Sequence, residues 1–418
     1  MDNITKSKVE IMAPAGSYEA LMAAINAGAD SVYFGVEQLN MRARASNNFT
    51  LDDLRKIAAL GKEKGVRTYL TLNTILYDHD MSLMKKICDA AKEAGITAVI
   101  ASDIAAIHYA FTIGLEVHIS TQTNVSNIET VRFYAQYADV IVLARELTLQ
   151  QVKSIIDAIK KEQIKGPSGR LIGIELFAHG ALCVAVSGKC YMSLATYNAS
   201  ANRGACLQNC RRSYKVIDEE TGDELVIDNK YVMSPKDLCT IEFVDKIIEA
   251  GVGVLKLEGR GRAPEYVSVV TRVYKEAALS CAAGTYTPEK IAQWMTLLET
   301  VYNRGFWQGG YYLGKTLGEW SGSYGSKATT EKVLVGVVLN YFSKVNVAEI
   351  SLMAAGLKKG DSLLIIGPTT GVVTGVVETI YADDMMVDEA AKGSSVTIAF
   401  PSKVRVQDKV YIVVERKE

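Results

Sequence analysis

The segment Glu10-Ile-Met-Ala-Pro-Ala-Gly16, followed directly by residues 17–29, decides the fold. The first part is a short apolar run that ends in a turn, and the second part has the spacing of an amphipathic helix. This alternation continues to about residue 280. It predicts an α/β fold, a TIM-like (β/α)8 barrel. An open doubly wound sheet is less favoured, because Ala13-Pro14-Ala15-Gly16 is not the glycine-rich phosphate turn typical after its first strand.

Eight strand-like runs support the barrel. The predicted strands are 10–16, 31–35, 67–73, 98–102, 116–121, 140–144, 172–177 and 253–257. Predicted helices between them include 17–29, 51–64, 81–95 and 148–161.

The alternation of strand-like and helical segments is interrupted once, after the seventh predicted strand. Residues from about 178 to 248 intervene before the eighth strand and carry five of the seven cysteines. Because the loops that follow barrel strands form the active face, this insertion is the predicted working part of the molecule. Residues 1–308 are therefore predicted to form the barrel, with a cysteine-rich insertion at about 178–248.

A second change of pattern falls near residue 330. Residues 309–330 are rich in Gly, Tyr and Ser and are predicted to be a linker. Residues 331–418 contain short β-rich runs separated by Gly-Asp and Gly-Pro turns, which is typical of a small C-terminal β-barrel. The predicted strands there are 333–339, 362–366, 371–377, 395–400 and 409–414.

The charge balance limits the classes of partner. Lys and Arg number 46 against 47 Asp and Glu, which gives a formal net charge of −1. This excludes a generally basic nucleic-acid coat but leaves room for a local basic patch. The sequence begins without the apolar stretch of a signal peptide and contains no apolar run long enough to cross a bilayer, so we expect a cytoplasmic protein with no membrane partner.

The cysteine spacing indicates an inorganic centre. Six residues separate Cys183 from Cys190, fifteen separate Cys190 from Cys206, and three separate Cys206 from Cys210. Clustered thiols in a reducing compartment suggest metal before disulfides. A [4Fe–4S] cluster is the favoured interpretation, because zinc ribbons prefer two tight pairs and the first gap is wide. Structural zinc and unligated buried thiols are the remaining alternatives. Cys239 is a substitute ligand or, preferably, a helix-start residue that packs inward.

Several segments resemble one known family. The run from Glu175 to Ser193 is similar to the signature segment of the collagenase-like, unassigned peptidase family. Further matching segments occur in the same order along the first domain: Ala13-Pro-Ala-Gly16, Gly28-Ala-Asp-Ser-Val-Tyr-Phe-Gly35, His118-Ile-Ser-Thr-Gln122 and Leu257-Glu-Gly-Arg260.

That resemblance implies more than the family's name. Its better-understood members are oxygen-independent hydroxylases with a [4Fe–4S] cluster. Some of them hydroxylate the wobble uridine of tRNA with prephenate as the hydroxyl source, one acts on ribosomal RNA, and others serve ubiquinone synthesis. The Cys206-x3-Cys210 pair is similar to the tRNA-hydroxylase branch. We therefore expect a [4Fe–4S] cluster held by Cys183, Cys190, Cys206 and Cys210, a tRNA partner, and prephenate as co-substrate.

Polar residues at the predicted strand ends complete the expected site. A dicarboxylate requires arginines, because the guanidinium fork pairs bidentately with a carboxylate. The predicted substrate-binding residues are Arg42, Asn73, Gln122, Arg145 and Arg260, and the predicted catalytic residues are His179 and Glu258. The predicted RNA-binding residues are Lys189, Arg203, Arg211 and Arg212. Barrel-top salt bridges for the arginines, and a merely solvated face for the basic run, are the alternatives.

The predicted function is thus an RNA hydroxylase that forms 5-hydroxyuridine at the tRNA wobble position. The alternatives are a hydroxylase of ribosomal RNA or of a quinone precursor, and a collagenase-like peptidase. The sequence has no His-Glu-x-x-His or Gly-x-Ser-x-Gly motif and only four histidines, which disfavours the peptidase. A Cys183–His179 pairing would leave the other clustered thiols unexplained.

Overall fold

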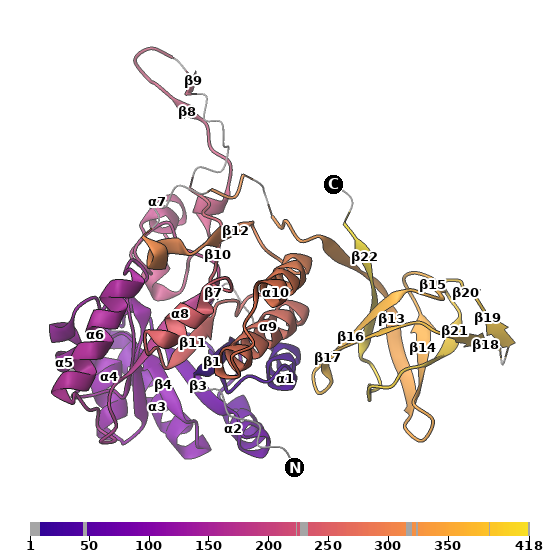
Figure 1. The fold of residues 1–418 in the computed structure, drawn as a ribbon, viewed down its shortest axis with the longest axis horizontal. Coiled ribbons are helices and arrows are strands. Elements are labelled where there is room, and N and C mark those ends of the chain that lie inside the picture. The colour runs from indigo at the N-terminus through magenta and orange to yellow at the C-terminus, as the bar shows by residue number, and fades with distance from the viewer. Residues whose placement is uncertain are drawn as a thin grey trace.

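The computed structural model describes residues 9–44, 48–222, 224–225, 233–314, 320–322, 325–383 and 385–416. Figure 1 shows a β/α unit built from the N-terminal three-quarters of the chain, with a smaller β-rich unit beside it. The cysteine-bearing insertion lies at one end of the larger unit.

Eight parallel strands form a closed barrel. The strands pair in chain order, and the last strand pairs with both the first and the seventh, which closes the ring. They are β1 (Glu10–Pro14), β2 (Ser31–Phe34), β3 (Arg67–Leu72), β4 (Ala98–Ala101), β5 (Glu116–Ile119), β6 (Val140–Val142), β7 (Gly173–Gly180) and β11 (Val254–Leu257). The (β/α)8 prediction is confirmed, and each predicted strand overlaps an observed one.

Helices surround the barrel because their apolar faces bury against the strands. The side chain of Ser17 caps α1, and the left-handed Gly65 and Gly95 end α2 and α3. The helices are α1 (Tyr18–Asn26), α2 (Asp53–Lys64), α3 (Met81–Ala94), α4 (Ile104–Thr112), α5 (Ile128–Tyr134), α6 (Leu149–Glu162), α8 (Val244–Glu249), α9 (Pro264–Ala282) and α10 (Pro288–Thr300).

Two strands that were not predicted extend the barrel sheet, one from the insertion and one from residues 306–308. After α7 (Met192–Tyr197) and a hairpin of β8 (Val216–Ile217) and β9 (Glu224–Leu225), β10 (Asp237–Cys239) pairs antiparallel with β7. On its other side, β10 pairs with β12 (Phe306–Gln308). A buried ion pair between Asp237 and Arg304 fixes these two strands together.

Part of the predicted linker folds onto the barrel. Gly310–Leu313 forms a 3-10 turn in which the buried Tyr312 hydroxyl donates to the Phe177 carbonyl, 2.9 Å away. Of the remaining linker, residues 315–319 and 323–324 lie outside the described residues.

The C-terminal unit is antiparallel and β-rich, as predicted. Its eight-stranded sheet runs in the order β17-β16-β22-β13-β14-β21-β18-β19. These strands are β13 (Thr330–Phe342), β14 (Val347–Leu352), β16 (Ser362–Gly367), β17 (Gly371–Val376), β18 (Ile380–Ala382), β19 (Met385–Val387), β21 (Ser395–Ala399) and β22 (Lys409–Glu415). The prediction missed β14, β18 and β19. This unit touches the barrel where β17 meets α1, and Asn26 Nδ2 donates to the Thr370 carbonyl there.

Among the described residues, no helix is both long enough and apolar enough to cross a membrane.

Candidate functional site

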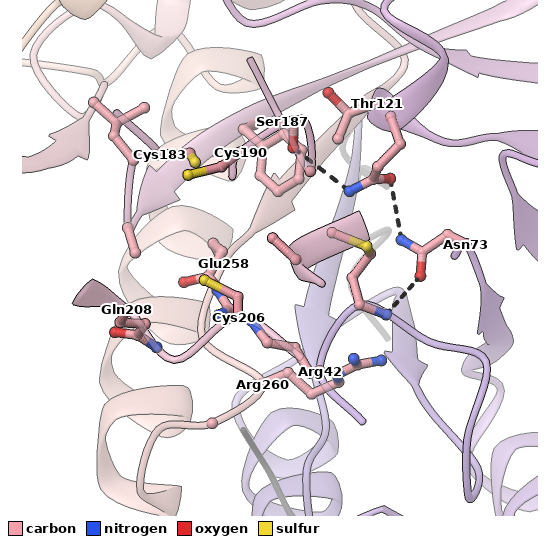
Figure 2. A pocket seen from close by; sticks show the side chains of 18 of the residues that line it. Arg42, Asn73, Thr121, Cys183, Ser187, Cys190, Cys206, Gln208, Glu258 and Arg260 are labelled. Carbon is pink, nitrogen blue, oxygen red and sulfur yellow. Dashed lines mark hydrogen bonds and ion pairs between the residues drawn. The ribbon is translucent and has the colours of Figure 1, made fainter. Parts of the chain in front are cut away.

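A cavity of about 220 Å³ opens at the carboxyl ends of the barrel strands, under the insertion. Its wall includes all four clustered cysteines, and its base includes side chains from β2, β3, β7 and β11. Figure 2 shows the thiols of Cys183, Cys190 and Cys206 facing the same space as Arg42, Glu258 and Arg260. The four residues predicted to hold a cluster therefore share one cavity with all five of the predicted substrate-binding residues.

Four thiols are a donor set that fits either a zinc ion or a [4Fe–4S] cluster. Burial raises the pKa of the Cys210 thiol, and Cys183, Cys206 and Cys190 each add to that rise, so the four thiols lie within electrostatic reach of one another. Within the described residues, no three His, Cys, Asp or Glu side chains gather as closely as one ion requires.

Gly204 allows the insertion to approach the loop after β2. Its φ is 79°, and a Cβ atom there would lie 2.2 Å from the Asn40 carbonyl oxygen. Only glycine fits this left-handed, close-contact position. It keeps Cys206 near Arg42, which follows β2.

Replacing Gly204 with alanine is expected to lower the free energy of unfolding by about 3 kcal/mol, because left-handed strain adds to a backbone clash. Gly222 is a matched control, since its φ is 78° and a Cβ atom added there would have no other atom within 4 Å. Gly222→Ala should cost about 1 kcal/mol or less. Urea denaturation followed by circular dichroism checks both values. Equal effects of the two changes would contradict this account of Gly204.

Arg42 and Glu258 form an ion pair at the cavity base. Their Nη2 and Oε1 atoms are 2.7 Å apart. Burial alone would raise the pKa of Glu258, but Arg42, Arg262 and Arg145 together lower that pKa to about 2. Glu258 is therefore ionised at neutral pH. It can anchor Arg42, but it does not hold a proton to donate.

Arg260 is buried and held by neutral partners. Its Nη1 donates to the Thr71 hydroxyl, and its Nη2 donates to Asn40 Oδ1 over 2.5 Å. Burial lowers the pKa of Arg260 to about 10. This arginine lines the cavity, but two of its three guanidinium nitrogens already donate hydrogen bonds to Thr71 and Asn40. Its third nitrogen, the buried Nε, has no hydrogen-bond partner among the described atoms.

Asn73 and Gln122 form an amide network that ties the insertion to the barrel. Asn73 Nδ2 donates to Ser120 and to Gln122 Oε1, each over 3.2 Å, and its oxygen accepts from the Met41 backbone. Gln122 Nε2 reaches Ser187 at 3.5 Å, as Figure 2 shows. Both predicted substrate-binding amides line the cavity, but their hydrogen bonds are largely used in positioning the Cys183–Cys190 loop.

His179 does not line the cavity. It is buried behind it, where its ring packs against Tyr274 and Phe306, and its Nδ1 lies 3.4 Å from the Tyr274 hydroxyl. Burial lowers the pKa of His179 to about 4, although Asp237 and Glu258 oppose that shift. This placement favours a packing and positioning role over contact with substrate.

The low pKa of His179 predicts a pH-dependent stability. The folded protein keeps this imidazole neutral, while the unfolded chain takes up a proton below about pH 6.5. Stability should therefore fall as pH falls from 6.5 toward 4, by about 3 kcal/mol from this group. Urea unfolding of wild type and of His179→Leu measures it. The stability difference between the two proteins should shrink by that amount, and a constant difference would contradict it.

The four predicted RNA-binding residues divide into two pairs. Lys189 and Arg212 are exposed, and the Arg212 guanidinium lies 5.2 Å from the Tyr197 ring centre. Arg203 instead pairs with Asp80 and lies over Tyr77, while Arg211 donates to the Leu182 and Pro235 carbonyls. The second pair holds the insertion in place.

Other groups at the site escaped prediction. Lys256 lines the cavity and pairs with the fully buried Glu175 over 2.7 Å, and Arg262 and Tyr33 line it as well. The sequence did contain signals for two of these residues. Lys256 is a lysine inside the apolar run Val254-Leu-Lys-Leu257, and Arg262 is a second arginine two residues after Arg260. Cys239 packs inward against Tyr274 and Met295 and does not line the cavity, as preferred from the sequence, but it ends strand β10 and does not begin a helix.

Comparison with known proteins gives a family match and two kinds of relative. The profile of peptidase family U32 matches residues 16–322. A collagenase of Porphyromonas gingivalis is 56% identical over 409 residues, which cover 98% of this chain and 99% of that protein. The tRNA hydroxylation protein P1 of Bacillus subtilis is 32% identical over 397 residues, covering 91% and 88%. The 23S rRNA 5-hydroxycytidine C2501 synthase of Escherichia coli is 33% identical over 274 residues, covering 65% and 40%.

Proposed function

The chain belongs to peptidase family U32, and from that premise we propose that it is an RNA hydroxylase rather than a peptidase. Its proposed reaction forms 5-hydroxyuridine at the wobble position of tRNA, with prephenate as the hydroxyl source and a [4Fe–4S] cluster as cofactor. A tRNA substrate would place the enzyme in the cytoplasm.

One observation carries the proposal: four thiols from the insertion line a single cavity at the catalytic end of a (β/α)8 barrel. Cys183, Cys190, Cys206 and Cys210 would hold the cluster. When bound, a cluster there supplies redox or Lewis-acid chemistry beside the cavity. The similarity to the Bacillus subtilis tRNA hydroxylation protein extends over most of both chains and supports an RNA substrate.

The residues of the chain itself supply binding and orientation. Arg42, Arg145 and Arg260 surround the cavity base and suit an anionic co-substrate. Lys189 and Arg212 are exposed on the insertion and could contact RNA phosphates. The buried, ion-paired Glu258 keeps Arg42 in place.

Deleting the gene should abolish the 5-hydroxyuridine derivatives of bulk tRNA in the source organism. Mass spectrometry of digested tRNA nucleosides measures this, because loss of the hydroxylating enzyme leaves unmodified uridine. Complementation with the wild-type chain should restore the modification, and complementation with the Cys206→Ala chain should not. Unchanged nucleosides in the deletion strain would remove tRNA as the substrate, and parallel digestion of ribosomal RNA would then show whether rRNA is the target.

The Porphyromonas gingivalis relative favours a second candidate, a collagenase-like peptidase. A peptidase needs an activated nucleophile, but His179, the histidine near Cys183 in sequence, is buried behind the cavity. Gelatin cleavage by the purified chain tests this candidate. Cleavage that persists in a Cys206→Ala variant would establish the peptidase, and its absence from both proteins leaves the hydroxylase.

A further inference from the structure

The cavity lining contains more positively charged side chains than are paired with carboxylates of the described residues. Two of its lining cations have a carboxylate partner: Arg42 pairs with Glu258 and Lys256 pairs with Glu175, each at 2.7 Å. Among the described residues, the other four have no carboxylate at ion-pair distance. The six cations of the lining are Arg42, Arg145, Arg211, Lys256, Arg260 and Arg262.

Two of the four cations that lack a carboxylate partner donate hydrogen bonds to neutral groups. Arg260 donates to Thr71 and Asn40, and Arg211 donates to backbone carbonyls and to Ser234. Their side chains brace the barrel mouth and the insertion. The other two are Arg145 and Arg262. Their guanidinium groups have the most N–H groups without a hydrogen-bond acceptor among the described residues.

Arg145 and Arg262 share an uncommon arrangement. The guanidinium of Arg145 lies 3.8 Å from the centre of the Phe177 ring, and that of Arg262 lies 3.6 Å from the centre of the Tyr302 ring. Arg145 Nη1 donates to the Ala181 carbonyl, and the buried Nε of Arg145 has no hydrogen-bond partner among the described residues. The Arg262 backbone N–H donates to the Gly259 carbonyl, but within the described residues the Arg262 guanidinium donates no hydrogen bond. An aromatic face holds the guanidinium plane but leaves its N–H edge open, which is the edge that binds a carboxylate bidentately.

Both arginines line the same cavity as Glu258. Each lowers the pKa of Glu258, so each lies within electrostatic reach of that carboxylate, whose charge Arg42 already balances. Two guanidinium groups that have no carboxylate at ion-pair distance among the described residues suit a ligand that brings its own anionic groups.

We propose that Arg145 and Arg262 form a two-point clamp for a small dicarboxylate, one carboxylate to each guanidinium, while Arg42 and Arg260 hold the wall of the site. The identity of the ligand as co-substrate rests on the proposed function. The clamp itself rests on the charges and contacts of the cavity.

Titration calorimetry of prephenate into the anaerobically purified full chain tests the clamp. Arg145→Gln and Arg262→Gln should each raise the Kd at least about tenfold, since each removes one charge-assisted bidentate pair. The corresponding lysine variants should lie between wild type and the glutamine variants, because lysine keeps the charge but loses the fork. Arg132→Gln, an exposed change on α5 that removes the same charge away from the cavity, should leave Kd within about twofold.

Binding of a monocarboxylate is the second measurement that tests the clamp. Phenylpyruvate keeps one carboxylate, so it should bind wild type more weakly and lose affinity in only one of the two glutamine variants. Melting curves by circular dichroism establish that each variant is folded. A prephenate Kd within twofold of wild type in either glutamine variant would overturn the two-point clamp, as would no binding to wild type.

Failure of the clamp and failure of the proposed function give different results. Prephenate binding that depends on both arginines, with unchanged tRNA nucleosides in the deletion strain, supports the clamp and removes the tRNA reaction. Lost nucleosides together with normal prephenate binding by both variants support the reaction and overturn the clamp.

Discussion

Cys206→Ala is expected to remove the iron from the anaerobically purified protein, from about four atoms per chain to almost none. Cys206 lines the cavity opposite the amide network and lies within electrostatic reach of Cys210. Losing one of four thiolates leaves one iron without a protein ligand, and the cluster becomes open to solvent and loss. Iron and acid-labile sulfide assays, with the disappearance of the brown colour, measure the effect.

Two other cysteines serve as controls. Cys88 is buried in α3 and Cys281 is half-buried in α9, and neither lines the cavity. Cys88→Ala and Cys281→Ala should retain the iron of wild type. Full iron content in Cys206→Ala would contradict the ligand assignment. Stoichiometric zinc without sulfide in the wild-type protein would replace the cluster with a structural zinc site.

The barrel could be predicted because its signal is periodic. Each of the eight strands is a run of apolar residues followed by a helical pattern, and this repetition makes up for the weakness of any single run. β10 and β12 could not be predicted, because each has only three residues and neither belongs to the strand–helix repeat that identified the equally short β6. What holds them is the ion pair of Asp237 with Arg304, a contact between positions 67 residues apart.

The same contrast applies to the site. The clustering of cysteines in the chain predicted a shared location, and all four line one cavity. The strand-end positions of Arg42 and Arg260 predicted where they lie but could not show what they bind. Arg42 pairs with Glu258, whereas Arg260 binds Asn40, and these partners lie more than 200 residues away in sequence. Sequence position therefore identified the site, while the roles of its charges depend on tertiary contacts.

Glu175→Leu is expected to lower the free energy of unfolding by about 3–5 kcal/mol, because it leaves the ammonium of Lys256 buried without its partner. Glu175 is fully buried in the barrel and Lys256 is 5% exposed, with 2.7 Å between Oε1 and Nζ. Adding Lys256→Met should restore most of the lost stability, since two apolar side chains of similar length replace the pair without a stranded charge. Urea denaturation of the single and double variants measures both effects.

A surface pair gives the matched control for this prediction. Lys153 and Asp157 lie one turn apart on α6, and both side chains are more than half exposed. Asp157→Leu removes the same charge but leaves Lys153 in water, so the expected change is below about 1 kcal/mol. Equal losses for Glu175→Leu and Asp157→Leu would show that burial does not set the cost. A double variant no more stable than Glu175→Leu would show that packing around Glu175, rather than the stranded ammonium, supports the base of the cavity.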